Sequence, residues 1–170
     1  MMIAVMVNEV VLKHTAIVTG TLLLKFQFTN FLLGGKRIES GARPPEDEKL
    51  FGIKAGPQDF DGTSKVLAFE KRDDEKSLEK VRKAQLEERR SARLVMNDLE
   101  NIPLGLIVAW MDVLCGGHPT VHILCVWLFC LGRCTHSYAY MKALQPMRAI
   151  GFGFGLLSTI ILAMNAVLAL

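Results

Sequence analysis

Four blocks of mostly apolar residues divide the polar parts of this 170-residue chain. The last block, 149–170, has no charged residue, and a helix needs roughly 20 mostly apolar residues to cross a bilayer. The other blocks contain only a few charged or polar positions. The pattern predicts an all-α, integral-membrane four-helix bundle in a single domain. The predicted spans are about 10–33, 93–115, 119–141 and 148–170.

Glycine and proline mark the predicted ends of these spans. Gly116-Gly117-His118-Pro119 predicts a tight turn between the second and third spans, with the proline at the first helical position. Gly34-Gly35 predicts the end of the first span. Gly151 and Gly155 form a GxxxG spacing that permits close contact between helices.

The long segment 34–92 contains most of the 20 lysines and arginines, and the turn 142–147 adds Lys142. Because basic loops stay on the cytosolic side, we expect both loops in the cytosol and both termini in the lumen. Within the first loop, the residue pattern predicts irregular structure over 34–63. It predicts a charged helix over 71–92 that continues into the second span. Acidic residues dilute the basic ones to a net charge of only +3, which argues against a nucleic-acid partner. A signal peptide is the alternative for the first block, but the block lacks a basic start and a small-residue cleavage site.

Polar side chains enter the spans at their cytosolic ends, in stripes that each follow one helix face. One stripe consists of Arg93, Asn97 and Glu100, and the other consists of Arg133, His136 and Tyr140. The flanking cations are Lys36, Arg37 and Arg148. Their excess of cations predicts a polar pocket for a small anionic ligand, since guanidinium groups match carboxylates. Interhelical pairing, or cations that reach the headgroups, is the alternative interpretation. The spacing of the cysteines does not predict a metal site.

Four segments, in order, resemble signatures of the MAPEG family, membrane-associated proteins of eicosanoid and glutathione metabolism. They are "PPED" (44–47), "RLVMNDLENI" (93–102), "GRCTHSYAY" (132–140) and "QPMRA" (145–149). The resemblance covers the chain except for about 25 to 30 extra residues in the first loop.

The resemblance implies a homotrimer that binds glutathione, as co-substrate and without a metal, near the cytosolic side between subunits. The glutathione-binding residues would be Lys36, Arg37, Arg93, Asn97, Glu100, His136, Tyr140 and Arg148. Arg148 would stabilise the glutathione thiolate, and Asp47 matches an acid implicated in prostaglandin synthase activity.

The expected function is therefore glutathione transfer to lipophilic electrophiles and reduction of lipid hydroperoxides. Met96 and Ala149 place the chain nearer the microsomal glutathione transferase branch than the prostaglandin E synthase branch. A prostaglandin synthase-like isomerase is one alternative. A non-catalytic regulator or scaffold is the other, favoured by Val95, where the family has a histidine, and by the enlarged loop. The expected location is the endoplasmic reticulum, with the outer mitochondrial membrane as the alternative.

Overall fold

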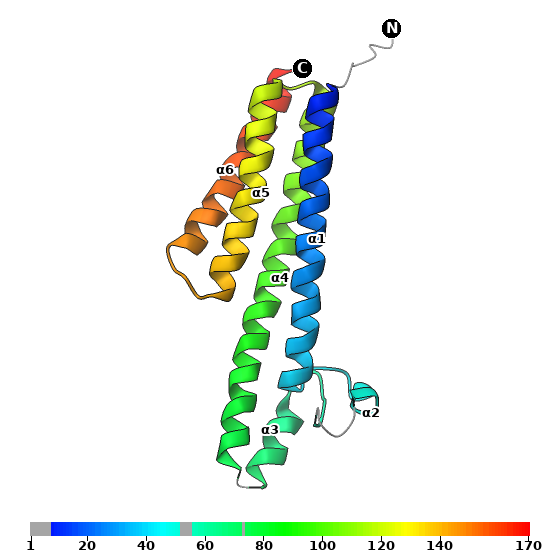
Figure 1. Ribbon diagram of the computed structural model, residues 1–170, viewed down its shortest axis with the longest axis vertical. Coiled ribbons are helices and arrows are strands. Elements are labelled where there is room, and N and C mark those ends of the chain that lie inside the picture. The colour runs from blue at the N-terminus through cyan, green and yellow to red at the C-terminus, as the bar shows by residue number, and fades with distance from the viewer. Residues whose placement is uncertain (1–7, 52–55, 73) are drawn as a thin grey trace. The chain divides into compact units, whose positions relative to one another are not determined.

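The computed structural model describes residues 8–51, 56–72 and 74–170, and this part of the chain is helical, with no strand (Figure 1). The prediction of an all-α protein is confirmed. The helices are α1 (Glu9–Ser40), α2 (Asp47–Phe51), α3 (Thr63–Glu70), α4 (Glu75–Cys115), α5 (Pro119–Met141) and α6 (Met147–Leu168). The chain forms two compact units, which we describe separately. The bundle unit comprises the described residues 8–27 and 96–170, and the loop unit comprises those between 28 and 95.

The bundle unit combines the first part of α1, the second part of α4, and the antiparallel pair α5 and α6 (Figure 1). Each helix contributes one apolar stripe to a shared core. Its buried members include Val18, Leu22, Ile102, Ala109, Val126, Phe129 and Leu162. Large apolar side chains on the other faces stay exposed, as on α1 and α6, where Leu24 and Leu168 are 72% and 84% exposed. Such outward apolar surface is typical of helices that face lipid rather than water.

Two of the described helices, α1 and α6, are long and apolar enough to cross a membrane. The α5 helix carries Arg133 and two histidines, and the first half of α4 is highly charged. These polar positions lower the mean hydropathy of α4 and α5, although both helices pack their apolar stripes into the bundle core.

The turn between α4 and α5 covers a buried polar network. His122 lies between two partners, with its Nδ1 2.8 Å from Asp112 Oδ2 and its Nε2 2.7 Å from Thr15 Oγ1. Asn165 Nδ2 donates to both oxygens of Asp112. A Cβ at Gly117 would lie 1.9 Å from Asp112 Oδ1, so this turn position accepts only glycine. The network ties all four helices of the bundle unit together.

In the loop unit, α1 continues beyond the predicted span. It passes through Gly34 and Gly35 and ends at Ser40, followed by Gly41 with φ of 87°. The prediction of irregular structure from residue 34 is therefore wrong for 34–40. Two glycines cost a helix only about 1 kcal/mol each relative to alanine. Contacts with α4 at Lys36 and Arg37 offset that cost.

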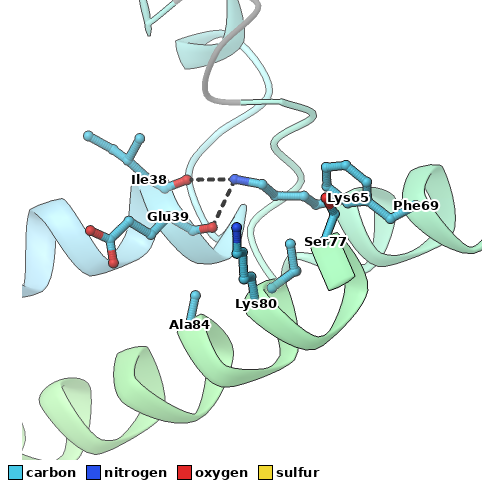
Figure 2. A pocket seen from close by; sticks show the side chains of 8 residues that line it. Ile38, Glu39, Lys65, Phe69, Ser77, Lys80 and Ala84 are labelled. Carbon is cyan, nitrogen blue, oxygen red and sulfur yellow. Dashed lines mark hydrogen bonds between the residues drawn. The ribbon is translucent and has the colours of Figure 1, made fainter. Parts of the chain in front are cut away.

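Lys65 of α3 holds the C-terminus of α1 (Figure 2). Its Nζ donates to the carbonyl oxygens of Ile38, at 3.2 Å, and Glu39, at 2.8 Å. These carbonyls have no partner within the helix, and a cation is favourable at the negative end of the helix dipole. Lys65 is buried, and this burial lowers the pKa of its ammonium group.

The charged helix predicted for 71–92 begins later, because α4 starts at Glu75. Asp74 acts as its N-cap and accepts a hydrogen bond from the Ser77 backbone N–H at 3.1 Å. From there α4 is continuous to Cys115 and includes Pro103.

Candidate functional site

The junction of α5 and α6 gathers three of the candidate residues. His136 Nδ1 lies 3.0 Å from the backbone oxygen of Arg148, and since a carbonyl oxygen only accepts, this nitrogen is the donor. The Arg148 guanidinium carbon lies 5.2 Å from the centre of the Tyr140 ring, within the range of a cation–π contact. The His136 ring also lies close to the rings of Tyr140 and Phe152. The structure therefore brings His136, Tyr140 and Arg148 into one cluster.

This cluster contains a half-buried cation and a buried nitrogen without a hydrogen-bond partner among the described residues. The Arg148 and Tyr140 side chains are half-buried rather than enclosed. His136 is buried, and its Nε2 has no hydrogen-bond partner among the described residues. With its proton on Nδ1, the neutral imidazole presents Nε2 as an acceptor. The junction thus combines a permanent cation with a free acceptor.

Close helix contact fixes the position of Arg148. A Cβ on Gly151 would lie 2.7 Å from the backbone nitrogen of His136 and 2.9 Å from the carbonyl oxygen of Gly132. Only glycine permits α6 to approach α5 this closely. The predicted role of Gly151 in the GxxxG spacing is confirmed, and this contact places the first turn of α6 beside His136.

Asn97 and Arg133 belong to a second polar cluster in the bundle unit. Arg133 Nη2 donates to Asn97 Oδ1 and to Asp98 Oδ1, each at 2.7 Å. Lys25 Nζ contacts the other oxygen of Asp98 at 2.5 Å. Arg133 and Asp98 are 1% and 0% exposed. Arg133 therefore forms a buried interhelical pair, the alternative interpretation considered for the polar stripes, and the predicted ligand residue Asn97 is one of its partners.

Two further candidates are separate from these clusters. Arg93 and Glu100 are exposed, and neither has an ion pair or hydrogen bond to another candidate residue within the described parts of the chain. Arg93 belongs to the loop unit and Glu100 to the bundle unit. Both side chains are exposed on the surface of the unit to which they belong.

In the loop unit, the cations at the end of α1 pair with acids of α4, and Lys36 also pairs with Glu39 of α1 itself. Lys36 Nζ lies 2.7 Å from Glu87 Oε2 and 3.1 Å from Glu39 Oε2, and Arg37 Nε lies 3.5 Å from Glu88 Oε1. The hydrogen bond from the Lys36 ammonium holds the pKa of the Glu87 carboxyl below its usual range. No motif in the sequence indicates that these glutamates contact the candidate cations.

Arg37 and Asp47 line the same open pocket of the loop unit, about 600 Å³ in volume. Glu88 and Phe60 also line it, as does Arg43, whose Nε donates to Asp47 Oδ2 at 2.7 Å. Two guanidinium groups and two carboxylates therefore share one pocket, a charge pattern suited to a ligand that carries both an ammonium and a carboxylate. Arg43 is a further candidate residue that sequence reasoning missed, although it precedes "PPED" directly.

Within the described ranges, no group of three or more His, Cys, Asp or Glu side chains is placed to hold a metal ion.

The helical bundle and its membrane-capable helices are those of an integral membrane protein. The chain belongs to the MAPEG family, whose family model matches residues 15–168. Membrane proteins with glutathione-related transferase, isomerase or related functions make up this family. No curated protein matches the chain.

Proposed function

We propose that this protein is a membrane-bound glutathione transferase that conjugates glutathione to lipophilic electrophiles and also reduces lipid hydroperoxides. The observation that carries the proposal is the junction of α5 and α6, where His136, Tyr140 and Arg148 lie together. Family membership supports glutathione as the thiol substrate. The finer assignment to the microsomal transferase branch rests on Met96 and Ala149.

Arg148 is the residue proposed to activate the thiol. A free thiol has a pKa near 8.5, so it is mostly protonated at neutral pH, and a nearby guanidinium favours its thiolate. His136 acts as a positioning residue, since its hydrogen bond fixes the backbone of Arg148. In conjugation, the thiolate sulfur forms a bond to an electrophilic carbon. In a substitution, the leaving group departs with the electron pair of its bond and takes up a proton. In an addition, the electron pair displaced from the double bond or the ring of the electrophile takes up the proton. In hydroperoxide reduction, two thiols supply two electrons and yield a disulfide, an alcohol and water.

The remaining candidates are proposed to bind the peptide part of glutathione. Arg37 and Asp47 share their pocket with Arg43 and Glu88, which matches the ammonium and carboxylate ends of such a ligand. Lys36, Asn97 and the exposed Arg93 and Glu100 complete the proposed set. We propose that two neighbouring subunits of a homotrimer share each site, which would use the outward exposure of Arg93 and Glu100.

The proposed topology places the loops 34–92 and 142–147 in the cytosol and both termini in the lumen of the endoplasmic reticulum. Four spans, at about 10–33, 93–115, 119–141 and 148–170, are part of this proposal. Single cysteines introduced into a cysteine-free variant would test it. Impermeant maleimide added to sealed microsomes should label position 80 and not position 170.

Arg148→Ala tests the proposed activation, with Lys142→Ala as a control, since Lys142 is an exposed cation of the turn that precedes α6. Wild-type protein purified in detergent should bind glutathione and show the ultraviolet absorption of a thiolate. In Arg148→Ala we expect turnover to fall about 10²-fold, the loss typical of one electrostatic stabiliser. Its pH–rate profile should move toward the pKa of the free thiol, which a merely structural role would not cause.

Two outcomes would contradict the proposal. Glutathione bound without a thiolate signal would favour the non-catalytic regulator or scaffold. If folded wild-type protein does not bind millimolar glutathione, the protein is not a glutathione-dependent enzyme, and the prostaglandin synthase-like alternative is lost as well.

A further inference from the structure

A second open pocket of the loop unit lies among the end of α1, α3 and the first turns of α4 (Figure 2). Its volume is about 420 Å³, within the range of small-molecule sites. It shares no lining residue with the pocket that contains Asp47. Its walls are mostly apolar and are formed by Ile38, Phe69, Val81 and Ala84.

Lys65 is a buried cation of this lining that has no carboxylate partner within the described parts of the chain. It is 7% exposed, and its Nζ donates to the backbone carbonyls of Ile38 and Glu39. The end of a helix carries only about half a negative charge. The Glu39 carboxylate pairs with Lys36 instead, at 3.1 Å. An anion in the pocket would therefore supply negative charge that the protein itself does not place beside Lys65.

Lys80 adds a second cation, which a ligand can contact directly. Its side chain extends from α4 toward the end of α1, as does that of Lys65 (Figure 2). Lys80 is exposed, and it forms no ion pair with any residue that the structure describes. Two lysines and one carboxylate, that of Glu39, line the pocket, so the lining has a formal charge of +1. This excess of positive charge favours an anionic ligand.

The apolar walls indicate the rest of the ligand. Val81 is buried, whereas Phe69 is half-buried and can still contact a bound molecule. An aromatic ring gains more against another ring than its buried area alone provides. We propose that the pocket binds a small aromatic carboxylate, with the carboxylate at Lys80 and the ring against Phe69 and Val81. Lys65 attracts the carboxylate through its charge and need not contact it. This site is separate from the proposed glutathione chemistry and does not depend on it.

Three variants test the charge and the shape of this pocket separately. Lys80→Met removes the ammonium group and keeps an unbranched side chain. Lys83→Met is the matched control, because Lys83 is also an exposed lysine of α4 but does not line the pocket. Ala84→Leu enlarges a half-buried side chain of the pocket wall and leaves both lysines in place.

The experiment is calorimetric titration of the full chain in lipid nanodiscs with 2-naphthoate or 2-naphthalenemethanol, after subtraction of the heat from empty nanodiscs. The two probes share one ring system and differ in charge. Wild-type protein should bind the acid about tenfold more tightly than the alcohol, the difference expected for one charge-assisted hydrogen bond. Lys80→Met should remove this preference and leave the alcohol unchanged, and Lys83→Met should match the wild type. Ala84→Leu should weaken both probes about tenfold. The unfolding temperature of each variant verifies its fold.

Equal affinity for acid and alcohol in the wild type would overturn the proposal, and so would the absence of saturable naphthoate binding up to millimolar concentration. Unchanged naphthoate binding in a folded Lys80→Met or Ala84→Leu would also overturn it, because the acid would then bind elsewhere. Failure of the proposed function gives a different result, since glutathione binding would be absent while the preference for naphthoate remains.

Discussion

The Asp98 carboxylate is the common partner of two buried cations, so its replacement should destabilise the protein strongly. Asp98→Asn keeps the size and shape of the side chain, removes its charge and replaces one acceptor oxygen by an NH2 donor. The Lys25 and Asp98 side chains are 13% and 0% exposed, and Arg133 is 1% exposed, so water does not compensate the lost charge. Removal of one partner from a buried ion pair costs about 3–5 kcal/mol. For a chain of this length, that corresponds to a fall in Tm of about 6–20 °C.

Thermal unfolding of detergent-purified protein measures this effect, with Glu100→Gln as control. Glu100 lies on the same helix and is exposed, so its neutralisation should change the free energy of unfolding by less than about 0.5 kcal/mol. Lys25→Met in the Asp98→Asn background should restore part of the loss, because one unpaired cation is then removed. A loss below about 1 kcal/mol in Asp98→Asn would refute the reasoning. Such a small loss would mean that the Lys25 side chain extends to water or lipid headgroups once Asp98 no longer holds it.

Two further predictions concern the junction of α5 and α6 and the pair at the end of α1. Gly151→Ala should destabilise the protein by about 1–3 kcal/mol, because its methyl group would overlap the His136 backbone, whereas Gly153→Ala should not; unfolding temperatures compare the two. Because Lys36 lowers the pKa of Glu87, this pair stabilises the fold above the unfolded-state pKa of the glutamate, and the stability is lost as pH falls through the folded-state pKa. Glu87→Gln should flatten the pH dependence of the unfolding temperature in this acidic range, and an unchanged slope would contradict the assignment.

Periodicity and breakers predicted much of the helical structure. The turn at Gly116–Pro119 separates α4 from α5, and the GxxxG glycine Gly151 lies at a close helix contact. The end of α1 was predicted too early, because Gly34 and Gly35 weaken a helix locally. The contacts that stabilise α1 as far as Ser40 come from α3 and α4, which follow much later in the sequence.

Partners of buried ions were the main features that sequence reasoning missed. Lys25 needs a partner within its span, but Asp98 is 73 residues away, and its neighbours Asn97 and Glu100 attract attention instead through their motif. Arg133 fits a ligand pocket and an interhelical pair equally well by spacing alone. Only the three-dimensional arrangement shows that its Nη2 is engaged. His136, Tyr140 and Arg148 could be grouped in advance because they lie on either side of one short turn.

The separation of Lys25 from Asp98 also has a consequence for synthesis of the chain. Ribosomes add about 5–20 residues per second, so the lysine precedes its carboxylate by roughly 4 to 15 s. During that interval the membrane-capable helix α1 carries a charge with no partner of its own, which disfavours its release into lipid. The translocation machinery would therefore retain α1 until α4 arrives, and the two helices would leave it as a pair.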